Sequence, residues 1–271
     1  MQALVEGGTR HYGRFAARPA TVNPLDEFGP VSRVLRRQRL KEWVGFTLLH
    51  PRWYSSLIMQ DAHYLASSEI YAYDRERAAL HQHASTRRGG TLALPTGLAG
   101  SHCAYHTRGY TLEYDFAPDG HGRHRLRLDI AASPTAPAFG GELELHADGA
   151  SAPLSVSSRL PGGRMYTHKA IFPVSGTMRV GERTIAFDPA RDLAILDEHK
   201  SLLPYRTSWL WGTFALPAER GPVGANFADR PSVPGAEEES CLWVPGGCEP
   251  LADVGFAPAS TDPLAPWTIA S

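Results

Sequence analysis

The chain has 271 residues, of which 42% are hydrophobic and 20% are charged, and this composition is typical of a globular protein with a sizeable core. The 27 basic and 28 acidic side chains are interspersed and give a formal net charge of -1, so no basic face indicates a nucleic-acid partner. No stretch approaches the roughly 18 apolar residues of a membrane helix, and we therefore expect no membrane span.

The first part of the chain changes character near residue 41. Residues 1–30 are rich in Gly and Pro and are predicted to be irregular, while residues 31–40 carry a basic cluster that suits a short, solvent-exposed helix. Residues 41–50 are apolar on both faces, as in a central strand, and further strands are expected at 54–60 and 68–74. Residues 75–88 are polar and are predicted to form a helix or a loop.

Alternation of apolar and polar residues is clearest between residues 109 and 157. Asp119-Gly120 and Asp148-Gly149 separate the alternating segments, as turns do in β-hairpins. Strands with one apolar face imply a sheet that closes on itself or packs on another sheet. We predict an all-β protein of antiparallel hairpins with few short helices, forming two lipocalin-like (calycin-like) barrels or sandwiches in tandem. The predicted layout is an irregular segment 1–30, a first barrel or sandwich over 31–162 and a second over 163–271.

The segment 197–211 is the densest in chemically active side chains, among them Asp197, His199, Tyr205, Arg206, Trp209 and Trp211. If residues 205–214 form a strand, Tyr205, Trp209 and Trp211 share one face and make an apolar wall with polar tips. Such a wall suits a pocket for a largely apolar ligand with a few fixed polar contacts. The alternative is an aromatic stripe that only fills a core.

Six ordered landmarks resemble the domain-of-unknown-function family 2804: LKEWVGF, HPRWYSS, MYTHK, DEHKSLLPYRTSWLW, PVGANF and LAPWTI. The Tyr-Arg-Thr-x-Trp-x-Trp string is the most specific, and the match runs from about Asn23 to the C-terminus. The resemblance points to Trp43, Lys169, Arg206, Trp209, Trp211 and Asn226. It also implies that the chain is similar to a member truncated at its C-terminus. His199 departs from the family, where Gly is common near this position.

The family has no assigned activity. Its overall pattern is similar to that of the calycin-like double-barrel proteins, which include carotenoid hydratases. It implies an apolar ligand, lipid- or isoprenoid-like, held by Trp43, Lys169, Trp209, Trp211 and Asn226. A cofactor-free hydratase, isomerase or cyclase would use Asp197, Tyr205 or Arg206 to polarise the substrate. A lipid- or metabolite-binding protein would have the same pocket without chemistry. Neither function fixes the oligomeric state.

The sequence gives less support to a cofactor or a metal site than to an apolar ligand pocket. No glycine-rich dinucleotide or P-loop motif occurs, so we expect no cofactor. A weaker alternative is a metal site at His81, His83, His102 and His106, although their spacing matches no established zinc signature. Three cysteines without a C-x-x-C pair, and an N-terminus without the apolar core of a secretion signal, predict a cytoplasmic protein.

Overall fold

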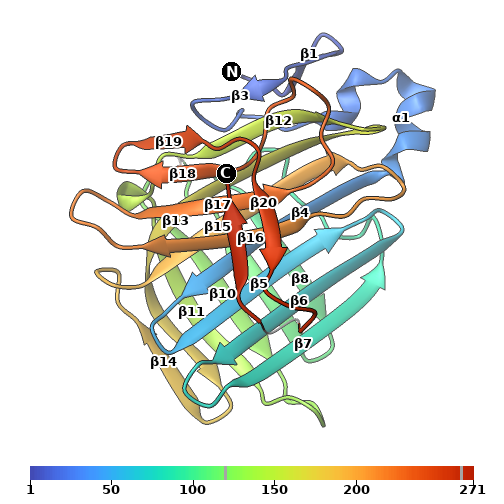
Figure 1. Ribbon diagram of the computed structural model, residues 1–271. Helices are drawn as coiled ribbons and strands as arrows, with labels where there is room; N and C mark the ends of the chain where they lie inside the picture. The colour runs from blue at the N-terminus through green and yellow to red at the C-terminus, as the bar shows by residue number, and fades with distance from the viewer. Residues whose placement is uncertain (119–120, 263–264) are drawn as a thin grey trace.

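The computed structural model describes residues 1–118, 121–262 and 265–271. Among these residues, 13 strands form one sheet that curls into a nearly closed barrel (Figure 1). The strands are β3 (Gly13–Arg14), β4 (Leu40–Leu49), β5 (Trp53–Asp61), β6 (Leu65–Asp74), β7 (Ala79–Arg88), β8 (His102–Thr107), β9 (Tyr110–Asp115), β10 (Arg123–Ile130), β11 (Phe139–His146), β12 (Leu154–Leu160), β13 (Gly163–Val180), β14 (Arg183–Phe187) and β15 (Leu193–Leu202). They run in the order β7-β6-β5-β4-β15-β13-β11-β10-β9-β8, with β12 and β14 paired to β13 and β3 paired to β12.

The ladders of this sheet are antiparallel, and the prediction of an all-β protein built from hairpins is confirmed. The alternation between 109 and 157 becomes β9 to β12: the apolar side chains of β9, β10 and β11 enter the barrel core, while Leu154 and Val156 of β12 belong to a separate outer cluster. The expected Asp119-Gly120 turn lies outside the described residues. The prediction for 75–88 is wrong for most of its length, because β7 begins at Ala79. This strand lies at one edge of the sheet order and has mostly solvent-facing side chains, which explains its polar sequence.

The 18-residue strand β13 connects the two halves of the sheet. Its first half pairs with β12 and β15, and its second half pairs with β11 and β14. The turn around residues 161–163 joins β12 to β13 within the sheet, so strands from both sides of residue 162 belong to it. The division into two units at residue 162 stays a prediction.

The two faces of the wall formed by β4, β13 and β15 carry different cores. Phe172 and Leu196 point into the barrel and belong to the main core. Their chain neighbours Ile171 and Ile195 point outward and pack with Ala215, Cys241 and Trp243 in a separate cluster. Strand alternation therefore gives this wall a second, outer core.

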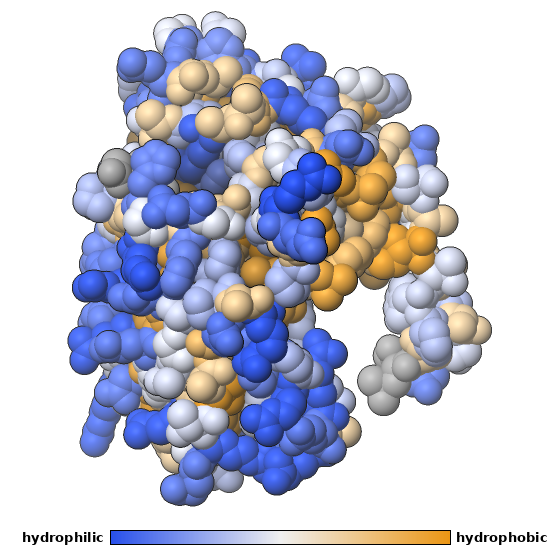
Figure 2. Space-filling model, turned by 90° about the vertical axis from the view of Figure 1, so that its left-hand side faces the viewer, coloured by the Kyte–Doolittle hydropathy of each residue, from blue (hydrophilic) through white to orange (hydrophobic). Residues whose placement is uncertain are grey.

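A small sheet covers the outer core. It consists of β16 (Leu210–Leu216), β17 (Val223–Asp229), β18 (Cys241–Val244) and β19 (Gly247–Pro250), paired in that order. A last hairpin, β20 (Gly255–Pro258) with β21 (Trp267–Ala270), lies beside it, and Phe256 and Ile269 approach Gly212 of β16. Figure 2 shows hydrophobic side chains gathered on this side of the molecule, from which the last hairpin projects.

The N-terminal part forms short elements along one end of the barrel: β1 (Val5–Glu6), β2 (Thr9–Arg10), the 3-10 turn η1 (Pro24–Glu27) and helix α1 (Pro30–Arg37). A second 3-10 turn, η2 (Ala147–Gly149), follows β11. The predicted short helix is confirmed, and its apolar residues Val31, Val34 and Leu35 are exposed. In the described part of the chain, no helix combines the length and hydropathy needed to cross a membrane.

Candidate functional site

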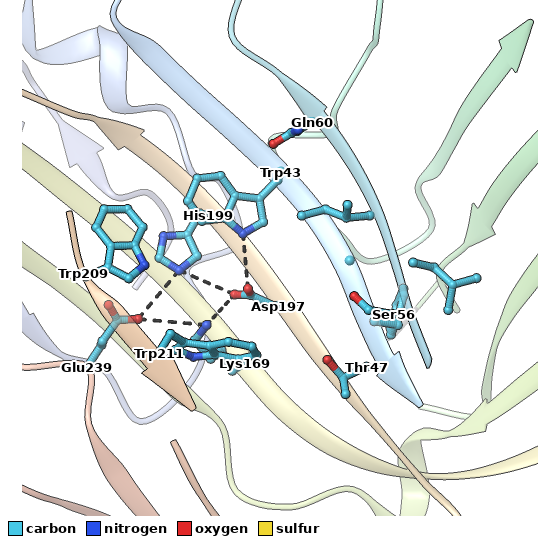
Figure 3. A pocket seen from close by; sticks show the side chains of 14 residues that line it. Trp43, Thr47, Ser56, Gln60, Lys169, Asp197, His199, Trp209, Trp211 and Glu239 are labelled. Atoms are coloured by element: carbon cyan, nitrogen blue, oxygen red, sulfur yellow. Dashed lines mark hydrogen bonds and ion pairs between the residues drawn. The ribbon is translucent and has the colours of Figure 1, made fainter. Parts of the chain in front are cut away.

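A cavity of about 280 Å³ lies on the outer face of the barrel wall, beside the small sheet (Figure 3). Strands β4, β13 and β15 form its floor, and the small sheet with its adjoining segments supplies the aromatic and acidic side. Ser56 and Gln60 of β5 also line it, and Gln60 is exposed. The cavity is lined by Trp43, Gly45, Phe46, Thr47, Ser56, Leu57, Ile58, Gln60, Lys169, Asp197, His199, Trp209, Trp211 and Glu239.

Strand register assembles the floor of this cavity. Lys169 is opposite Asp197 in the β13–β15 ladder, and Asp197 is opposite Gly45 in the β15–β4 ladder. Two residues further along β15, His199 is opposite Trp43. Because residues i and i+2 of a strand share a face, these side chains all point outward. A Cβ at Gly45 would lie 2.8 Å from the Leu57 carbonyl oxygen, so this position next to Asp197 has no room for a side chain.

Four titratable side chains point toward one another in the cavity (Figure 3). The buried Lys169 Nζ donates to Asp197 Oδ1 at 2.5 Å and lies 3.9 Å from Glu239 Oε2. Nε2 of His199 lies 3.4 Å from Asp197 Oδ1 and 3.7 Å from Glu239 Oε2. Arg230 Nε is 3.5 Å from the other oxygen of Glu239. The cluster thus holds two carboxyls against one ammonium, one guanidinium and one imidazole.

Three tryptophans surround the cluster. Trp43 stacks on His199 with 4.1 Å between ring centroids, and its indole N–H donates to Asp197 Oδ2 at 3.2 Å. Trp209 lies 6.5 Å from Trp43, and Lys169 Nζ lies 5.1 Å from the ring of Trp211. These faces give the cavity apolar walls and place π-electron density beside its cation.

Asn226 holds the acidic side of the cavity in position from behind. Its Oδ1 accepts the indole N–H of Trp211 at 2.8 Å, and its Nδ2 donates to the backbone carbonyl of Glu239 at 2.8 Å. The amide is fully buried. One side chain of β17 therefore fixes both a wall tryptophan and the loop that carries Glu239.

The two carboxyls respond oppositely to this environment. Burial alone would raise the pKa of Asp197, but the charge of Lys169 and the hydrogen bonds from Lys169 and Trp43 hold that pKa below its ordinary value. Burial dominates at Glu239 and raises its pKa, although Lys169 and Arg230 act in the other direction. Burial lowers the pKa of His199 to about 3, so this imidazole is neutral at pH 7.

The structure brings together most, but not all, of the residues singled out in the sequence. Trp43, Lys169, Asp197, Trp209 and Trp211 line the cavity, and Asn226 supports it. Tyr205 is 92% exposed and packs against Arg39 at the surface, and Arg206 is also exposed, so neither lines the cavity. Strand β16 begins only at Leu210, and the expected strand face therefore does not extend back through Tyr205.

Glu239 was missed in the sequence. It lies at the end of the acidic run 237–239, two residues before the first residue of the apolar strand β18. An acidic residue beside a buried strand start is a signal that could have indicated it. His199, given less weight because it departs from the family pattern, lies at the centre of the cluster.

The four histidines of the metal alternative have separate surroundings. His83 Nε2 contacts the Pro137 carbonyl oxygen at 2.7 Å, and His81 lies near the Trp53 ring. His102 and His106 pair with acidic residues of β9, at 2.7 Å from Asp115 and 3.0 Å from Glu113. Among the described residues, no group of three or more His, Cys, Asp or Glu side chains is arranged to hold a metal ion.

The fold and the site thus define an antiparallel barrel protein with a charged, tryptophan-walled cavity on its outer wall. Residues 17–271 match the domain of unknown function DUF2804, and the chain belongs to this family. Among solved structures it is similar to kievitone hydratase from Nectria haematococca, at 11% identity and a TM-score of 0.45, over 80% of this chain and 65% of that chain. A comparison with curated proteins gives no match.

Proposed function

We propose that the outer cavity binds an apolar, lipid- or isoprenoid-like molecule and carries out cofactor-independent acid–base chemistry of the hydratase or isomerase class. The observation that carries this proposal is the pair Asp197 and Glu239. Their environments move the two pKa values in opposite directions, and both carboxyls contact Lys169 and His199. Two titratable groups driven apart in this way are suited to act as base and acid.

The roles follow from the directions of the two pKa shifts. Glu239, whose pKa is raised, would in its protonated form donate a proton to one carbon of a substrate double bond, leaving positive charge on the other carbon. The indole faces of Trp209 and Trp211 would stabilise that charge. Water then adds to the cationic carbon, and Asp197 accepts the proton that the water releases. The product has gained one water, and the two carboxyls have exchanged one proton, which returns to Glu239 for the next cycle.

The cavity volume favours a small substrate or one part of a longer one. At about 280 Å³ it lies near the lower limit for drug-sized ligand pockets. A longer chain would leave the cavity past Gln60, the exposed residue of its lining on β5. The tryptophan walls would bind the apolar part of such a molecule, and the charged cluster between them would act on a single reactive position.

A binding protein without chemistry is the second candidate. Lys169 and Asp197 already neutralise one another at 2.5 Å, and Lys169 rests beside the Trp211 ring. In that arrangement the charges stabilise the fold of the cavity and the aromatic walls bind the ligand. The two candidates differ in whether a proton reaches the ligand.

Deuterium transfer tests the proposal. Native mass spectrometry of protein purified from its host identifies any co-purified apolar molecule, and that molecule and the acyclic terpene myrcene are incubated with protein in D2O. We expect the wild type to incorporate deuterium into one of them. Glu239→Gln should lower the rate by about 10²–10⁴-fold, as expected for loss of a general acid.

Glu237→Gln is the matched control, because Glu237 pairs with Arg14 and does not line the cavity. It should keep the wild-type rate. Bound ligand with no deuterium transfer would favour the binding protein. Undiminished transfer in Glu239→Gln would show that Glu239 is not the acid.

A further inference from the structure

A second cavity, of about 290 Å³, opens at the mouth of the barrel on the other face of the same wall. No residue lines both cavities. Strand β15 separates them, because Leu196 faces the barrel mouth while Asp197 faces the outer cavity. The segment 18–20 and the loop around Leu98 lie along its rim.

The mouth cavity has mainly apolar walls, and among the described residues that line it the one charged side chain is paired. Phe116, Phe172 and Leu196 form much of the wall. The guanidinium of Arg18, in this lining, makes a two-point ion pair with the buried Glu198, at 2.6 and 2.7 Å. The same guanidinium donates to the carbonyls of Pro19 and Thr96, which fixes the N-terminal segment over the mouth. A charged ligand would find no free counter-ion among the described lining residues.

Two neutral imidazoles supply the polar contacts of the cavity. Burial lowers the pKa of His168 to about 4 and also lowers the pKa of His124. The backbone N–H of Ala117 donates to His124 Nδ1 at 3.0 Å, so the ring proton resides on Nε2. His168 is 8% exposed, and its buried Nδ1 has no hydrogen-bond partner among the described residues.

We propose that the barrel mouth is a second ligand site, which takes a small neutral and mostly apolar molecule bearing a hydroxyl group. The hydroxyl would pair with His168, and the carbon skeleton would pack on Phe116 and Phe172. Buried polar groups in proteins are generally paired, and a ligand hydroxyl completes the partner set of this imidazole. The inference is independent of the chemistry proposed for the outer cavity.

Paired probes test this site. The wild type is titrated at pH 7 with 1-naphthol and with naphthalene, which differ by one hydroxyl, and binding is followed by fluorescence and calorimetry. We expect saturable binding of both, with 1-naphthol about 2–10-fold tighter, which is the contribution of one neutral hydrogen bond. His168→Phe should bind both probes equally.

Two further variants locate the probes. Ala99 is exposed at the rim, so Ala99→Trp should fold normally and should weaken both probes at least tenfold by filling the mouth. Trp211→Ala, in the outer cavity, should leave both affinities unchanged. The proposal is overturned if neither probe saturates, if His168→Phe keeps the preference, or if Trp211→Ala weakens binding while Ala99→Trp does not. Far-UV circular dichroism and thermal melting check that each variant folds. If His168→Phe does not fold, the titrations of Ala99→Trp and Trp211→Ala decide whether the probes bind at the barrel mouth.

Discussion

At the scale of single residues, the outer cavity depends on a histidine that stays neutral between two carboxyls. The ordinary pKa of histidine is 6.5, and burial lowers that of His199 to about 3. Between these values the unfolded chain binds a proton at this position and the folded protein does not. The free energy of unfolding therefore falls as the pH drops from about 6.5 to about 3, and the stabilisation is complete only above the upper value.

The variant His199→Phe should remove this part of the pH dependence. Phenylalanine keeps the ring stacked on Trp43 but cannot be protonated. Urea unfolding at pH values from 7 to 3 should therefore show that the free energy of unfolding falls more steeply with decreasing pH in the wild type than in the variant. Two curves that stay parallel over this interval would mean that His199 titrates in the same way in both states.

How far the site could be predicted depends on where its residues lie in the chain. Lys169, Asp197 and Trp211 stand within recognisable strings, and strand alternation places them on a face. Tyr205 belongs to the most specific string and yet is exposed, because the chain does not become a strand until Leu210. Glu239 lies in a loop about 40 residues after Asp197, and the packing of the small sheet brings the two together. No local sequence pattern predicts this contact.

At the scale of elements, the long strand β13 bends where it passes from one set of partners to the next. Gly176 has a φ of +112°, and a Cβ there would lie 2.3 Å from the Glu142 carbonyl oxygen. Gly176→Ala should therefore lower the free energy of unfolding by about 1–3 kcal/mol, measured by urea titration. Gly255→Ala is the control, because nothing lies within 4 Å of a Cβ there; it should change stability by less than about 0.5 kcal/mol. Equal effects of the two substitutions would contradict a strained bend.

The hairpins were the elements that the sequence predicted best. Alternation of apolar and polar residues is local, and β9, β10 and β11 each keep one face in the core. The sequence did not predict the edge strand β7, because few of its side chains are buried and it therefore lacks alternating apolar residues. The sequence did not predict the length of β13 either. Its first half is buried on both faces, and buried and exposed side chains alternate only in its second half.

At the scale of the whole molecule, side chains and not a backbone ladder close the barrel. Strands β7 and β8 are the two ends of the sheet order, and in the described residues no ladder joins them. Ser85 Oγ of β7 contacts Thr107 Oγ1 at 3.0 Å and accepts a hydrogen bond from Tyr105 at 3.2 Å, both residues of β8. Arg87 reaches the His106 carbonyl across the same seam.

Ser85→Ala should open this seam locally. It removes two hydrogen bonds and leaves the hydroxyl of the fully buried Tyr105 without this partner, for a cost of about 1–3 kcal/mol. Hydrogen exchange followed by mass spectrometry should show faster exchange in β7 and β8, with β4 and β15 unchanged, because local opening requires less free energy than global unfolding. Ser67→Ala, which removes an exposed contact with Gln60 on β5, is the matched control and should leave the exchange of β8 unchanged. If Ser85→Ala instead accelerates exchange in β4 and β15 as much as in β7, the barrel opens as one unit and the side-chain seam does not act as a separate closure.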